Sequence, residues 1–178
     1  IAQKELALEN NHYELKEKIE DYLIYGSYPE VLTSQNKNEK IEALDELINS
    51  YLYKDILALE RIKSTKIITN LVKLLAFQIG NQVSFNELSE NLGIDVKTTQ
   101  RYIDLLEKSF IIFPLSGLSR NLRKEIKTKD KYYFYDIGVR NGVISQFNEL
   151  ALRNDVGQLW ENFIVIERMK KTAYDNIH

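Results

Sequence analysis

The sequence contains no cysteine and few of the residues that interrupt helices. Without cysteine the chain can form neither a disulfide nor a thiolate metal site, which is typical of a cytoplasmic protein. Only seven glycines and two prolines occur in 178 residues. Because these two residue types break helices and mark turns, their scarcity predicts long helices joined by short connections.

The sequence also lacks the features of membrane and secreted proteins. No apolar run approaches the roughly 18 residues that span a bilayer, and the N-terminus has no charged-then-apolar signal pattern. We therefore expect a cytoplasmic protein without membrane contact. The net charge is −2, so any binding to nucleic acid has to come from a local basic patch. The chain begins at Ile1, and its one methionine is Met169, so we expect it to be a piece of a longer protein.

Apolar residues recur at helical spacing in several segments. This spacing predicts helices over residues 12–25, 39–60, 66–79 and 158–171, with Gly26 and Gly80 ending the first and third. Residues 26–30 are expected to form a turn because Pro29 disfavours helix at the residue before it. The polar residues 33–39 are expected to form a surface loop.

The region around Gly93 has the pattern of a helix-turn-helix. Ser84 and Glu87 form the pattern of a capping box, which starts a short helix. Gly93 then supplies a left-handed turn, and Asp95 is placed to cap a second helix that ends at about Lys108. The expected core of the helix pair consists of Phe85, Leu88, Leu92, Ile94, Thr99, Ile103 and Leu106.

A basic hairpin is expected after this helix pair. Residues 110–113 predict a strand stopped by Pro114, and residues 132–135 predict a second strand. Between them lie six basic residues against two acidic ones, an excess of +4. Helix, turn, helix and basic hairpin is the order of a winged helix.

A winged helix suggests binding to double-stranded DNA. The outward face of the second helix would contact it through Lys97, Thr98, Gln100 and Arg101, and the wing would add Arg120, Arg123 and Lys124. The alternative is a protein-interaction or oligomerisation module, with a homo-oligomer as one form, because Asp104 and Glu107 dilute the positive charge. An exposed apolar patch around Tyr102 or on the last helix would favour this alternative.

No catalytic or metal-binding residues are predicted. Asp136 precedes Ile137 and Gly138, which is typical of a turn with a carboxylate acceptor, and Glu161 and Glu167 are expected on the surface. The two histidines, His12 and His178, do not form a metal pair. The phosphate-binding pattern G-x-x-x-x-G-K-[ST] is absent. We therefore expect this chain to bind no cofactor and not to be an enzyme.

Five motifs in the same order resemble a prokaryotic AAA+-type ATPase family with a DUF4143-like C-terminus. They are GSYPEV at residues 26–31, YLYKDI at 51–56, the helix-turn-helix from Ser84 to Glu107, KYYFYDIG at 131–138 and GQLWENF at 157–163. Ser27 stands where the family usually has a second glycine.

The resemblance implies that an ATPase domain of the same chain precedes Ile1, with ATP and Mg²⁺ as cofactors of the full-length protein. It also implies that residues 137–178 begin a truncated PD-(D/E)XK nuclease-like domain, with Glu161 as its early helix glutamate and the remaining site residues beyond His178. The expected fold is mainly α with a small β component. A helical region (1–62) is followed by a winged helix-turn-helix (63–136) and a partial α/β segment (137–178).

Overall fold

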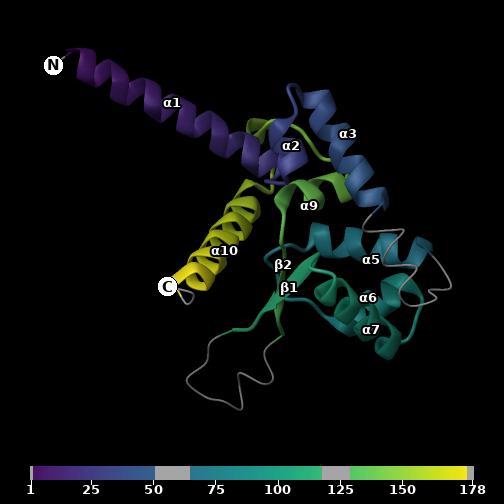
Figure 1. The fold of residues 1–178 in the computed structure, drawn as a ribbon. Helices are drawn as coiled ribbons and strands as arrows, with labels where there is room; N and C mark the ends of the chain where they lie inside the picture. The colour runs from purple at the N-terminus through teal and green to yellow at the C-terminus, as the bar shows by residue number, and fades with distance from the viewer. Residues whose placement is uncertain (1, 51–64, 118–128, 176–178) are drawn as a thin grey trace.

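The computed structural model describes residues 2–50, 65–117 and 129–175, with side chains from residue 13 onward (Figure 1). The elements are α1 (Ala2–Tyr25), α2 (Pro29–Thr33), α3 (Lys37–Leu47), α5 (Thr65–Phe77), α6 (Phe85–Leu92), α7 (Val96–Lys108), β1 (Ile112–Leu115), β2 (Lys131–Phe134), α9 (Ile137–Val143), the 3-10 turn η2 (Leu150–Leu152) and α10 (Val156–Asp175). The prediction of a mainly α fold with a small β component is confirmed. Among these residues, none of the helices combines the length and the apolar character that crossing a bilayer requires.

The N-terminal helices follow the predicted pattern with two differences. Gly26 ends α1 with φ +78°, as predicted, but α1 already begins at Ala2. The turn after it is shorter than predicted because Pro29 occupies the first turn of α2, where its missing N–H costs nothing.

The predicted loop over residues 33–39 is partly wrong because a capping box starts α3 within it. The Asn36 side chain accepts from the Glu39 N–H at 3.1 Å, and Glu39 accepts from the Gln35 N–H at 2.8 Å. The predicted helix over residues 39–60 is confirmed through Leu47, and its part from residue 51 onward lies outside the described residues.

α6 and α7 form the predicted helix-turn-helix. Gly93 adopts the left-handed conformation with φ +66°, and the Asp95 carboxylate accepts from the Thr98 N–H at 2.9 Å. The capping box at Ser84 is wrong, since the Ser84 side chain makes no cap hydrogen bond. The residue before Ser84 is held by a backbone hydrogen bond instead: the Val83 N–H donates to the carbonyl of Asp130, just before β2, at 3.0 Å.

The two strands of the hairpin are shifted from their predicted positions: β1 begins and ends two residues later, and β2 one residue earlier. β1 and β2 are antiparallel, and Pro114 lies inside β1 opposite Tyr132, so the prediction that Pro114 stops the strand is wrong. The Tyr135 N–H donates to the Ile111 carbonyl at 3.1 Å. Because hydrogen-bonded pairs alternate along an antiparallel ladder, Pro114 falls in a non-hydrogen-bonded pair, where its missing N–H would face away from β2. A single antiparallel bridge between Gln82 and Lys131 places a third short segment beside β2.

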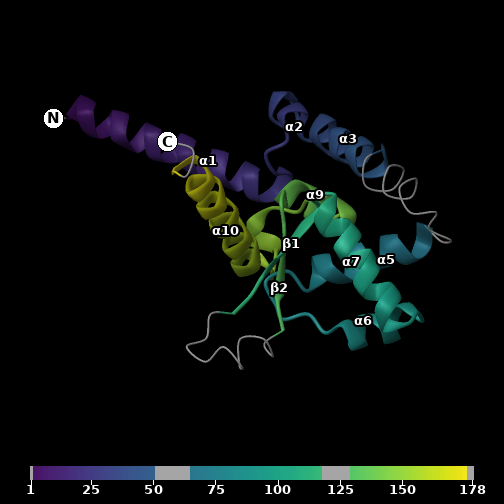
Figure 2. The same cartoon turned by 60° about the horizontal axis from the view of Figure 1, so that its bottom comes forward.

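One apolar core joins the three regions predicted from the sequence. It includes Leu23 of α1, Ile68 of α5, Ile103 of α7 and Leu159 of α10, and the short α9 lies among them (Figures 1 and 2). Residues 137–175 contribute helices and one 3-10 turn to the described structure. The N-terminal half of α1 projects away from this body in both views.

Candidate nucleic-acid interface

The outer face of α7 carries a row of polar side chains. Lys97, Gln100, Arg101, Asp104 and Lys108 are all exposed, and at 1.5 Å per residue they extend over about 16 Å of the helix. The opposite face of α7 is buried through Thr99, Tyr102, Ile103, Leu105 and Leu106. The helical period of the sequence therefore placed Lys97, Gln100 and Arg101 together on the surface, as predicted.

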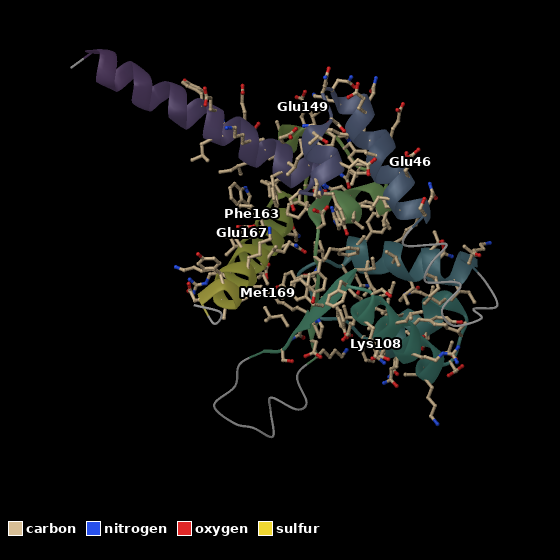
Figure 3. All side chains as sticks on the ribbon, in the orientation of Figure 1. Glu46, Lys108, Glu149, Phe163, Glu167 and Met169 are labelled. Carbon is tan, nitrogen blue, oxygen red and sulfur yellow. The ribbon has the colours of Figure 1, made fainter. Side chains whose placement is uncertain are left out.

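The charges along this row are unevenly distributed. Asp104 pairs with Lys108 at 2.7 Å, and both side chains are more than half exposed. Lys108 lies at the C-terminal end of α7 (Figure 3). The Arg101 guanidinium lies 5.3 Å from the centre of the Tyr102 ring. The one carboxylate of the row therefore has its own cation, and Lys97 and Arg101 give the N-terminal half of the face a net positive charge.

Thr98 has a structural partner at the start of α7. Its hydroxyl donates to one carboxylate oxygen of Asp95 at 2.6 Å, while its N–H donates to the other at 2.9 Å. These bonds lower the pKa of Asp95, with the hydroxyl of Thr98 as the largest cause. The hydroxyl that the sequence assigned to DNA thus contributes to the N-cap of α7.

The base of the wing lies beside α7. The Tyr132 hydroxyl of β2 donates to the Glu107 carboxylate of α7 at 3.2 Å, and burial raises the pKa of Glu107. Lys129 is exposed at the base of the hairpin. The predicted wing residues Arg120, Arg123 and Lys124 lie outside the described residues.

Asp136 forms a buried junction between distant parts of the chain. Its carboxylate accepts from the Val139 N–H at 3.0 Å, the local bond predicted for a turn, and also from the Ser27 N–H at 2.7 Å. Burial raises the pKa of Asp136 despite these bonds. A Cβ at Gly26 would lie 2.1 Å from the Asp136 carboxylate, and a Cβ at Gly138 would lie 1.9 Å from the Tyr25 carbonyl oxygen. The GSYPEV segment at residues 26–31 and the KYYFYDIG segment at residues 131–138 therefore pack tightly against each other.

Glu161 and Glu167 also have structural partners. Glu161 accepts from the Tyr133 hydroxyl at 2.6 Å and from Lys131 Nζ at 2.9 Å. Although partial burial opposes the shift, these two bonds lower the pKa of Glu161. Glu167, labelled in Figure 3, pairs with Lys170 at 2.8 Å. Across the described ranges, no three His, Cys, Asp or Glu side chains come together as metal ligands would.

The sequence analysis missed a buried polar network around α9. Asp155 binds the guanidinium groups of both Arg140 and Arg153, whose side chains are 2% and 0% exposed. Asn141 donates to the Leu23 and Ile24 carbonyls at 3.0 and 2.8 Å and so satisfies the C-terminal end of α1. A signal was present, because Arg140 and Asn141 interrupt an otherwise apolar stretch.

Comparison with known proteins places most of the chain in one family. Residues 16–150 match the family model of "Domain of unknown function (DUF8612)". An uncharacterized protein of Haemophilus influenzae is 26% identical over 156 residues, which cover 85% of this chain and 38% of that protein. Uncharacterized proteins of Methanocaldococcus jannaschii and Mycobacterium bovis are each 24% identical, over 92% and 79% of this chain and 36% and 32% of their own lengths. No solved structure matches the chain significantly.

These findings correct the family suggested by the five motifs. The matching family is a different one from the AAA+-type ATPase family with a DUF4143-like C-terminus, and the relatives carry no ATPase description. The resemblance was wrong, and the expectations of an ATPase core, ATP, Mg²⁺ and a nuclease-like segment lose their support with it. The chain spans about a third of the length of the relatives it matches, between 32% and 38%.

Proposed function

Because the chain belongs to the DUF8612 family of unknown function, the family assigns it no activity, and we propose from its own surface that it binds double-stranded DNA through α7 and the wing. The observation that carries the proposal is the exposed row of Lys97, Gln100 and Arg101 on the second helix of a helix-turn-helix. In such motifs the second helix enters the major groove and its N-terminal residues contact base edges. This role requires no catalytic group in the chain and is compatible with a cytoplasmic location.

The chemistry of the row fits duplex DNA. Arginine can bind guanine with two hydrogen bonds, glutamine can do the same with adenine, and lysine neutralises phosphates. The hydrogen bond between Tyr132 and Glu107 fixes the base of the wing against α7. A wing held in this way would bring its basic residues to the phosphates that flank the groove.

The distribution of charge along the chain supports the same surface. Residues 65–136 contain 11 basic and 8 acidic residues, a net charge of +3, whereas residues 1–64 contain 8 basic and 13 acidic residues, a net charge of −5. Charge of this kind steers the association with a polyanion. The winged helix would therefore face DNA, and the N-terminal helices would be turned away from it.

A protein-interaction role is the second candidate. The sequence suggested an exposed apolar patch for it either around Tyr102 or on the last helix, and these two places differ in exposure. Tyr102 is only 4% exposed, so its own side chain offers almost no apolar surface to a partner. The last helix, in contrast, exposes Trp160 and Ile164, one turn apart, by 38% and 53%. Because this apolar face belongs to α10 and the basic row to α7, a protein contact and DNA binding would use separate surfaces.

Fluorescence anisotropy with a labelled duplex, titrated at several salt concentrations, tests the proposal. Arg101→Ala should weaken binding by about 5- to 150-fold, and Lys18→Ala, which removes an exposed cation from α1, should leave it unchanged. Arg123→Ala in the wing should weaken binding to all sequences. It should also make the slope of log K against log[salt] shallower by about 0.9, the value for one lost phosphate contact. Binding no tighter than to a neutral polymer, or equal affinity of wild type and Arg101→Ala, would reject direct contact with DNA.

A further inference from the structure

The α10 helix carries an apolar stripe on its outer side. Trp160 and Ile164 stand one turn apart and are 38% and 53% exposed. Leu15 of α1, which shares a groove with Trp160, is 56% exposed. Leu15, Ile19, Leu150 and Trp160 line a groove of about 360 Å³ between α1, α10 and η2, with Lys16 and Glu20 on its α1 wall. Within residues 13–50, 65–117 and 129–175, no side chain fills this groove.

Two charged side chains lie along the same surface. Arg168 follows Ile164 by one turn, is exposed, and its guanidinium forms no ion pair with the described part of the chain. Glu20 is paired with Lys16 at 3.8 Å, and its side chain is 47% exposed. An exposed pair at this distance contributes little to stability, so Glu20 is accessible to another cation.

We propose that this face binds a second copy of the chain, with the two α10 helices packed antiparallel about Ile164. In an antiparallel pair, positions four residues before and four residues after the centre face each other. Arg168 of the second copy would then lie over the Trp160 ring and beside Glu20, while the two Ile164 side chains meet at the two-fold axis. The two-fold symmetry makes each of these contacts twice.

The charges and the aromatic ring favour this occupant. Trp160 and Arg168 stand at equal distances on either side of Ile164, so the stripe is complementary to itself only when the second helix is reversed. Among the aromatic side chains, tryptophan attracts a cation over its ring face most strongly. The same Arg168 would meet the Glu20 carboxylate on the groove wall. A parallel pairing would instead place Arg168 against Arg168.

Sedimentation velocity between about 1 and 100 µM tests the proposal. The wild-type chain should be a dimer at the upper concentrations, and Arg168→Glu should weaken the dimer about 30-fold or more because two cation–π contacts are lost and two repulsions with Glu20 are gained. The charge swap Glu20→Arg with Arg168→Glu should restore part of the dimer, because it removes the two repulsions but not the loss of the cation–π contacts. Phe77→Glu, a change at a 65% exposed apolar residue on α5, should have no effect.

Far-UV circular dichroism provides the control for folding. Substitutions at Arg168 and Glu20 should leave the spectrum unchanged because neither side chain is buried. A wild-type chain that stays monomeric throughout this concentration range would overturn the proposal. A dimer that Arg168→Glu does not weaken, or that the charge swap does not partly restore, would overturn the antiparallel register. The inference does not depend on DNA binding, since it concerns α10 and α1 and not α7.

Discussion

The side chain of Asn162 in α10 pairs with both backbone groups of Phe134 in β2. Its amide nitrogen donates to the Phe134 carbonyl, and its amide oxygen accepts from the Phe134 N–H, both at 2.9 Å. Asn162 is fully buried. The asparagine therefore takes the place of a neighbouring strand and attaches the last helix to the wing hairpin.

Replacing Asn162 with leucine should strongly destabilise the fold. The change leaves a buried N–H and a buried carbonyl of Phe134 without partners, and each costs about 1–3 kcal/mol. We expect the free energy of unfolding, measured by urea denaturation, to fall by about 2–6 kcal/mol. Asn154→Leu, at an exposed position, should change it by less than about 0.5 kcal/mol. Similar losses for the two variants would contradict the role of Asn162.

Glycine 138 should be far less tolerant of a side chain than Gly157. A Cβ at Gly138 would lie 1.9 Å from the Tyr25 carbonyl oxygen, whereas one at Gly157 would have no heavy atom within 4 Å. Gly138→Ala should therefore lower the stability by about 3 kcal/mol. Gly157→Ala should leave it unchanged or raise it by up to about 1 kcal/mol, since alanine favours helix. Thermal denaturation of both variants measures the difference, and equal melting temperatures would refute the close approach.

Asp155 should make the stability depend on pH in acid. Although burial opposes the shift, hydrogen bonds from Arg153 and Arg140 hold the pKa of Asp155 at about 2. A carboxyl whose pKa is lower in the folded state stabilises the fold above its unfolded pKa, near 3.9, and this contribution is lost as the pH falls to the folded pKa. From pH 4 to pH 2 the wild type should lose about 2 kcal/mol that Asp155→Asn does not lose. Parallel stability curves for the two proteins in this window would contradict the expected contribution.

The two helix N-caps of the helix-turn-helix should respond differently to alanine. Asp95 makes side-chain bonds to Thr98, whereas Ser84 makes no cap bond. Asp95→Ala should lower the free energy of unfolding because the cap bonds of α7 are lost, and Ser84→Ala should be close to neutral in the same denaturation experiment. A larger loss for Ser84→Ala would mean that the capping box forms after all.

The sequence predicted local features better than long-range ones. The left-handed turn at Gly93 and the cap at Asp95 depend on neighbouring residues, so both were predictable. Pro114 inside β1 could not be predicted, because its tolerance depends on which strand edge faces β2. Asn162 and Arg140 bind groups 28 and 64 residues away, and no local pattern reveals such partners.

The candidate interface shows the same division. Helical periodicity was sufficient to place Lys97, Gln100 and Arg101 on one exposed face of α7. The pairing of Asp104 with Lys108 leaves the positive charge in the N-terminal half of that face. This pairing depends on side-chain conformation, which the sequence does not specify.

The most direct test of DNA binding through α7 is an NMR titration of the ¹⁵N-labelled chain with a short duplex, recorded at low and at moderate salt. We predict that the backbone amides from Lys97 to Arg101 shift most, with Lys129 at the base of the wing, and that the amides of α3 do not shift. Shifts confined to α10, or none at duplex concentrations well above that of the protein, would contradict the proposed interface.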